Sequence, residues 1–143
     1  MKRFEFSLNN VLSMREFHEK EAEVALSRAV GERDIVKIAI EDLDLKIKEA
    51  SYLFSKDLDI NILFSTENYV RGLKIKKLQL QEKLIKLEKN VQVCIDHYIN
   101  SSKDRKLLEK LKEKKLGEWK KMVKKEEIIA IDEIISAKTI IQP

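Results

Sequence analysis

Proline and glycine are almost absent from this chain of 143 residues. The single proline is the last residue, Pro143, and the three glycines are Gly31, Gly72 and Gly117. Because proline breaks helices and glycine weakens them, a chain so poor in both can remain helical over most of its length. Cysteine is also scarce. The single Cys94 excludes an internal disulfide framework and is compatible with a reducing compartment.

Long apolar runs and aromatic residues are scarce as well. No stretch approaches the roughly 20 apolar residues that a membrane-spanning helix needs. No apolar segment of a secretory signal follows the basic pair Lys2-Arg3, so we expect a cytoplasmic protein. Aromatic residues make up 6% and charged residues 38% of the chain, which is typical of long helices. The hydrophobic share of 43% is too high for a disordered chain.

The apolar residues that are present recur at alternating spacings of three and four, as in helices that wind around each other. We predict a first helix over about residues 7–55, with Ser7 near its start as the N-cap. Its expected seam contains the following residues: Ala22, Leu26, Ala29, Arg33, Val36, Ile40, Leu43, Ile47, Ala50 and Phe54. The repeated alanines indicate a thin seam where two helices approach closely.

Between about residues 56 and 66 this pattern stops, because short polar side chains there compete for the backbone hydrogen bonds of a helix. We interpret this stretch as the tip of a hairpin, with Ser65 or Thr66 as the N-cap of the next helix. A short strand over Asp59–Phe64 is the alternative, although it would have no partner strand. The second helix is predicted over about residues 66–137.

The expected fold is therefore all-α, a single coiled-coil domain over residues 1–143 in which two long helices form an antiparallel hairpin. If the chain folds back near Asn61, Leu8 faces about Lys114, and the second helix extends past the first from about Leu116. We call this extension the C-terminal overhang. It carries apolar residues for which we expect no intramolecular partner, and exposed apolar surface often marks a binding site. These residues are Trp119, Met122, Ile128, Ile129, Ile131, Ile134 and Ile135.

Charge is distributed in blocks along the chain. Residues 71–89 carry seven basic and two acidic side chains, and residues 103–125 carry eleven and four. Residues 126–143, in contrast, carry one basic and four acidic side chains. Such blocks are often the solvated flanks of coiled coils, but they also suit acidic protein partners, anionic lipid or nucleic acid.

Catalytic and metal-binding motifs find little support in the sequence. His18 and His97 lie in different predicted helices and have no nucleophile or carboxylate constellation beside them. Cys94 and His97 share a helical face, but two ligands do not make a metal site, and Cys94 falls on the expected seam. We expect no enzymatic activity, cofactor, metal or small-molecule substrate.

Several local patterns resemble one known family. The chain begins with Phe6-x-Leu8-x-x-Val11-Leu12-x-x-Arg15-x-x-x-Glu19, opens its second helix with Asn68-Tyr69, and later carries Arg105-Lys106, Glu126-Glu127 and Asp132-Glu133. With its length and hairpin pattern, the chain resembles the FliJ family, the small soluble component of the flagellar type III protein export apparatus. The resemblance covers nearly the whole chain.

This resemblance implies a stalk-like coiled coil whose terminal ends enter the hexameric export ATPase and promote its assembly and activity. It also implies contact with the membrane export-gate protein, escort of export chaperones, and peripheral association with the inner membrane at the flagellar base. The residues expected to contact the ATPase are Leu116, Trp119, Lys120, Lys121, Met122, Lys124 and Ile129. For the gate they are Tyr69, Leu73 and Leu80, with seam packing as the alternative, and Gly72 stands where the family has an aromatic residue.

Two other functions remain open at this point. One is a nucleic-acid-binding coiled coil that uses the basic residues 71–89 and 103–125, although Trp119 is the only aromatic residue available there for stacking on bases. The other is the equivalent stalk of a virulence type III secretion system, which the same fold could serve.

Overall fold

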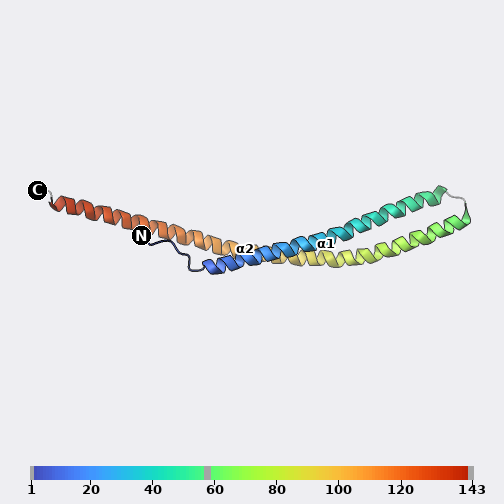
Figure 1. Cartoon of the computed structure of the whole chain (residues 1–143), viewed down its shortest axis with the longest axis horizontal. Helices are drawn as coiled ribbons and strands as arrows, with labels where there is room; N and C mark the ends of the chain where they lie inside the picture. The colour runs from blue at the N-terminus through green and yellow to red at the C-terminus, as the bar shows by residue number, and fades with distance from the viewer. Residues whose placement is uncertain (1, 57–58, 142–143) are drawn as a thin grey trace. The chain divides into compact units, whose positions relative to one another are not determined.

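Two helices account for nearly all of the computed structural model, which describes residues 2–56 and 59–141, apart from the side chains of 54–56 and 140–141. Helix α1 spans Asn9–Lys56 with 48 residues, and helix α2 spans Ile60–Ile141 with 82 residues (Figure 1). The described part of the chain contains no strand. The prediction of an all-α chain with a longer second helix is confirmed.

The first helix begins two residues later than expected. The first helical hydrogen bond runs from Leu12 N to Leu8 O at 2.9 Å, so Leu8 rather than Ser7 is the first acceptor. A turn closed by Asn9 N and Phe6 O at 3.1 Å precedes it. Residues 2–8 are therefore not helical, and they form an irregular segment that precedes α1.

Helix α2 begins earlier than predicted, because an aspartate caps it. Asp59 Oδ1 accepts a hydrogen bond from Asn61 N at 3.0 Å, and the Asp59 carbonyl accepts one from Leu63 N at 2.9 Å. These two bonds are the geometry of an N-cap. The expected tip over 56–66 is thus wrong from Ile60 onward, and so are the strand alternative and the caps Ser65 and Thr66. Residues 57–58 of that tip lie outside the described residues.

The contacts divide the chain into two compact units, and the larger one is Lys20–Ile99. Its core contains a row of α1 residues seven apart, which confirms the predicted seam from Ala22 to Ala50. The side chain of Phe54, the last residue of that seam, lies outside the described residues. The row is Ala22, Ala29, Val36, Leu43 and Ala50, and Leu73 and Val91 of α2 are buried with it. An ion pair of 2.6 Å joins Lys77 Nζ to Asp44 Oδ1 across the two helices.

The other unit consists of Met1–Glu19 with Asn100–Pro143. Here Leu12 of α1 and Leu108 of α2 are buried. In each unit a stretch of α1 packs antiparallel against α2, within a few residues of the predicted register. The contacting pairs Lys77–Asp44, Lys112–Asn9 and Arg105–Glu19 indicate this register. Both helices run through both units. The prediction of one domain over residues 1–143 stays a prediction.

Candidate partner-binding surfaces

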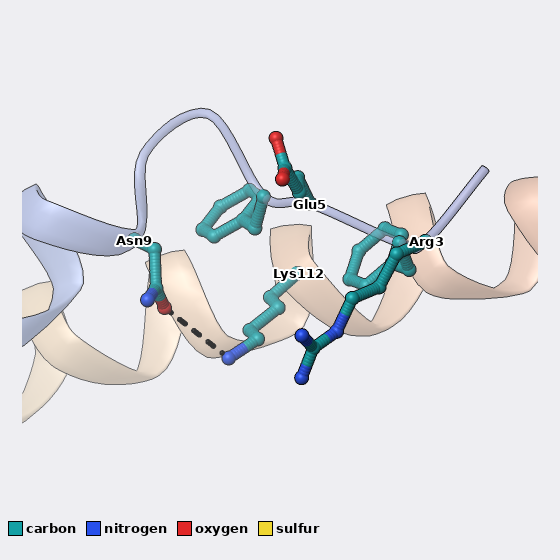
Figure 2. A pocket seen from close by; sticks show the side chains of 6 residues that line it. Arg3, Glu5, Asn9 and Lys112 are labelled. Atoms are coloured by element: carbon teal, nitrogen blue, oxygen red, sulfur yellow. Dashed lines mark hydrogen bonds between the residues drawn. The ribbon is translucent and has the colours of Figure 1, made fainter.

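The irregular N-terminal segment lies along α2 beside the single tryptophan. The rings of Phe4 and Trp119 are 5.8 Å apart between centroids and tilted by 55°. Phe4, Phe6 and Trp119 are all half-buried. Lys112 Nζ donates a hydrogen bond of 3.3 Å to Asn9 Oδ1 at the point where the segment joins α1 (Figure 2). Residues 2–7 also form a shallow hollow with residues of α2, namely Lys115, Glu118, Trp119 and Met122.

The expectation that Trp119 has no intramolecular partner is therefore wrong. An irregular or extended chain advances up to about 3.3 Å per residue, whereas a helix rises about 1.5 Å. The few residues before α1 therefore reach further along α2 than the same number of helical residues would, and so they reach Trp119. The doublet Phe4-x-Phe6 was the available signal, because two aromatic residues just outside a helix favour packing on a neighbouring surface.

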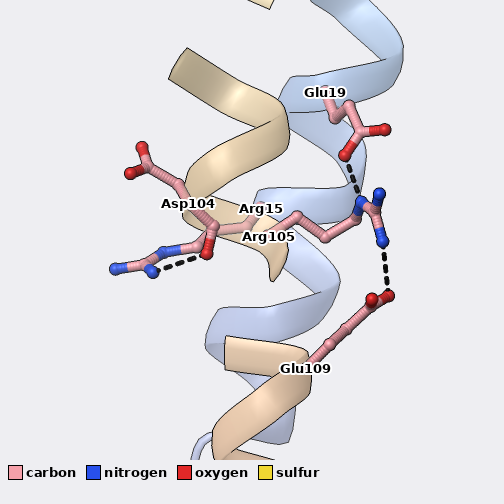
Figure 3. A network of polar contacts seen from close by, with 5 residues as sticks. All are labelled: Arg15, Glu19, Asp104, Arg105 and Glu109. Carbon is pink, nitrogen blue, oxygen red and sulfur yellow. Dashed lines mark hydrogen bonds and ion pairs between the residues drawn. The ribbon is translucent and has the colours of Figure 1, made fainter. Parts of the chain in front are cut away.

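Charged side chains hold the start of α1 against α2 in this unit. Arg105 Nε pairs with the carboxylate of Glu19, and Arg105 Nη1 lies 2.7 Å from Glu109 Oε1 (Figure 3). Arg15 Nη1 donates a hydrogen bond of 3.0 Å to the carbonyl oxygen of Asp104. The Glu19 and Arg105 side chains are only 16% and 22% exposed, less than those of the other ion pairs named in this article.

Hydrogen bonds to Glu19 and then to Glu109 raise the pKa of Arg105 above its usual range. The guanidinium is therefore cationic at every physiological pH. Sequence reasoning did not identify this pair of residues. Its signal was two opposite charges at apolar positions whose residue numbers fit the predicted register.

Beyond the N-terminal segment, α2 carries a run of apolar residues that nothing in the described chain covers. We call residues 124–139 the isoleucine segment. Every side chain of this segment is exposed. Its five isoleucines are between 50% and 58% exposed, namely Ile128, Ile129, Ile131, Ile134 and Ile135. A set of exposed apolar residues of this size indicates a contact surface for another molecule.

Comparison with known families assigns the chain. A family model described as flagellar FliJ protein matches residues 4–142. The chain belongs to the FliJ family. It is therefore a component of the flagellar protein export apparatus. No curated protein and no solved structure matched it.

In this FliJ-family chain, the seven residues expected to contact the ATPase do not form one surface. Successive residues of a helix are turned by about 100°, so Leu116, Trp119, Met122 and Ile129 share one side of α2. Leu116 and Trp119 are half-buried, whereas Met122 and Ile129 are 62% and 57% exposed. Lys120 lies at the edge of this side. Lys121 and Lys124 lie on the opposite side and are exposed.

The three residues expected to contact the export gate also differ in their exposure. Leu73 is 6% exposed and belongs to the helix–helix core, whereas Tyr69 is 53% exposed. Leu80 is half-buried and lines a shallow groove together with Asp42 and Lys76. The seam interpretation therefore applies to Leu73. Tyr69 and Leu80 keep accessible surface for a partner.

Other kinds of site find no support in the described chain. Cys94 is half-buried, as a seam residue would be. Residues 2–56 and 59–141 contain no group of three or more His, Cys, Asp or Glu side chains able to hold a metal ion. Within the same residues, neither helix has a stretch long and apolar enough to cross a membrane.

Proposed function

We propose that this chain binds the hexameric flagellar export ATPase through α2 and promotes assembly and activity of the ATPase ring. The observation that carries the proposal is the exposed apolar surface on one side of α2, where Met122 and Ile129 lie on the same side as Trp119. Family membership supports the export apparatus as the setting, in preference to a virulence secretion system.

The chemistry of this surface suits a partner with an apolar lining. Exposed isoleucine and methionine side chains are favourable to bury at a protein interface, at about 25 cal/mol per Å² of apolar area removed from water. Lys120 lies at the edge of this surface, whereas Lys121 and Lys124 are exposed on the opposite side of the helix. Negative charge around the apolar lining of the partner would therefore add electrostatic steering.

The test is a double substitution that removes apolar contact without disturbing the helix. Trp119→Ala together with Ile129→Asp should abolish stimulation of ATP hydrolysis when the purified chain is mixed with the export ATPase. Alanine favours helix, and position 129 is exposed, so helical content in far-UV circular dichroism should be retained.

Two residues in other parts of the chain supply a matched control. Phe64 is 65% and Ile35 is 69% exposed, so Phe64→Ala with Ile35→Asp makes similar changes at exposed sites. This control should stimulate hydrolysis as the parent chain does. Full stimulation by the Trp119/Ile129 variant would refute the proposed contact.

We further propose that the chain contacts the membrane export gate, escorts export chaperones, and is thereby held at the inner membrane. Of the three residues predicted for the gate, Tyr69 is exposed and Leu80 lines an accessible groove. A pull-down with the soluble part of the gate protein tests this contact. Tyr69→Ala should reduce capture, and Tyr52→Ala, at a residue 60% exposed on α1, is the comparison.

A further inference from the structure

One side of α2 in the smaller unit carries a continuous line of lysines. At about 100° per residue, nine positions between 103 and 125 fall within an arc of about 100° on the helix surface. Seven of the nine are lysine, and the other two are Leu107 and Gly117. The lysines, which we call the lysine stripe, are Lys103, Lys106, Lys110, Lys114, Lys121, Lys124 and Lys125.

Neither acidic residues nor the rest of the unit cover the lysine stripe. All nine positions of the arc are exposed. The acidic residues of the same stretch fall outside the arc, namely Asp104, Glu109, Glu113 and Glu118. Leu108 and Trp119, which face α1 and the N-terminal segment, lie on the opposite side of α2. The stripe is thus a solvent-facing line of positive charge about 33 Å long.

The same arc continues into apolar residues. Ile128 and Ile135 of the isoleucine segment lie within the arc and are 50% and 56% exposed, and Ile131, 55% exposed, lies about 20° beyond its edge. Asp132 is the one acidic residue of this segment within the arc. Ile129, which the proposed function assigns to the ATPase, points to another side. A surface that attracts negative charge along one stretch and offers bulky aliphatic side chains in the next matches an anionic bilayer. Its headgroups attract lysine, and its boundary region takes up apolar side chains.

Nucleic acid fits these observations less well. The stripe contains no arginine for bidentate phosphate contacts and no aromatic residue for stacking on bases. A nucleic acid would also leave the three isoleucines in water. We propose that α2 docks on an anionic lipid surface through the lysine stripe, with Ile128, Ile131 and Ile135 entering the headgroup boundary.

Co-sedimentation with lipid vesicles tests the docking. The full chain should bind vesicles of phosphatidylcholine with phosphatidylglycerol and not vesicles of phosphatidylcholine alone. Lys106→Glu, Lys110→Glu and Lys114→Glu together should weaken binding by about a hundredfold or more, since each lysine near such a surface contributes about fivefold. These three residues lie outside the set assigned to the ATPase, so stimulation of hydrolysis should persist in this variant.

A matched control separates the stripe from general basicity. Lys83→Glu, Lys86→Glu and Lys89→Glu make the same charge change at exposed positions of the other unit, and vesicle binding should stay close to that of the parent. Equal loss in both triple variants would overturn the docking surface, as would unchanged binding after the stripe substitutions.

The isoleucines distinguish lipid from other polyanions. The combined substitutions Ile128→Ser, Ile131→Ser and Ile135→Ser should weaken vesicle binding. The binding that remains should be electrostatic, so high salt should abolish it. The parent chain should keep part of its binding at high salt. The proposal fails if these substitutions change nothing, or if duplex DNA at the same salt concentration binds the parent chain more tightly than the vesicles do.

Discussion

At position 105 the heptad pattern of α2 places an arginine where an apolar side chain would pack. The structure satisfies this charge from two directions, through Glu19 of α1 and through Glu109 one turn further along α2. A planar guanidinium has several donors in a fixed arrangement and can engage both carboxylates at once, whereas a lysine ammonium acts as a point charge. The register in this unit therefore depends on a residue that apolar periodicity alone would count as a defect.

Arg105→Lys should consequently destabilise this unit, and more so at alkaline pH. The raised pKa of Arg105 means that its contribution to stability is present below the arginine range and is lost only above it. A lysine at this position loses its proton near its ordinary pKa of about 10.4, so the contribution disappears as pH rises through that value. Thermal unfolding followed by Trp119 fluorescence at neutral and alkaline pH measures the difference from the parent chain.

An exposed arginine provides the comparison for that measurement. Arg71 lies 3.5 Å from Glu67 with its side chain 68% exposed, and pairs of this kind contribute little to stability. Arg71→Lys should unfold as the parent does at every pH. Identical pH profiles for Arg105→Lys and Arg71→Lys would show that the contacts of Arg105 do not stabilise the unit.

Among the elements, α2 shows where sequence reasoning succeeded and where it failed. The spacing of apolar residues predicted both long helices and the buried row from Ala22 to Ala50, because burial on one side of a helix imposes that spacing. The start of α2 depends instead on one side chain, Asp59. Competing caps at Ser65 and Thr66 were equally plausible from sequence, since all three residue types cap helices. Exposed apolar residues such as Ile60 and Phe64 gave no periodicity to decide between them.

Asp59→Ala should therefore destabilise α2, whereas Ser65→Ala should not. Loss of an N-cap typically costs about 1 kcal/mol of the free energy of unfolding. Ser65 lies inside the helix, where alanine is at least as favourable as serine. Urea unfolding followed by circular dichroism gives both values, and amide hydrogen exchange at residues 60–63 reports local fraying. Equal stability of the two variants would contradict Asp59 as the cap.

Across the whole molecule, burial is uneven between the two units. The unit Lys20–Ile99 buries seven apolar residues, whereas the unit that holds the termini buries Leu12 and Leu108 among the described residues. The antiparallel register could be predicted because the apolar spacing of the sequence stops at one place only, near Asn61. The packing of the N-terminal segment could not, because an irregular backbone leaves no periodic signal in the sequence.

The uneven burial predicts two unfolding transitions that different probes will separate. Trp119 is the only tryptophan and lies in the unit with the smaller core, so its fluorescence reports on that unit. Circular dichroism reports on all of α1 and α2. Because stability follows the apolar area buried, the fluorescence midpoint in urea should lie below the circular dichroism midpoint.

Phe4→Ala sharpens this test, because the Phe4 ring contacts Trp119 directly. The substitution should lower the fluorescence midpoint further and leave the circular dichroism midpoint almost unchanged. Phe64→Ala, at an exposed ring of the other unit, should leave the fluorescence midpoint where it was. Coincident transitions in the parent chain would mean that the helices, which run unbroken from one unit into the other, couple the two into a single cooperative structure.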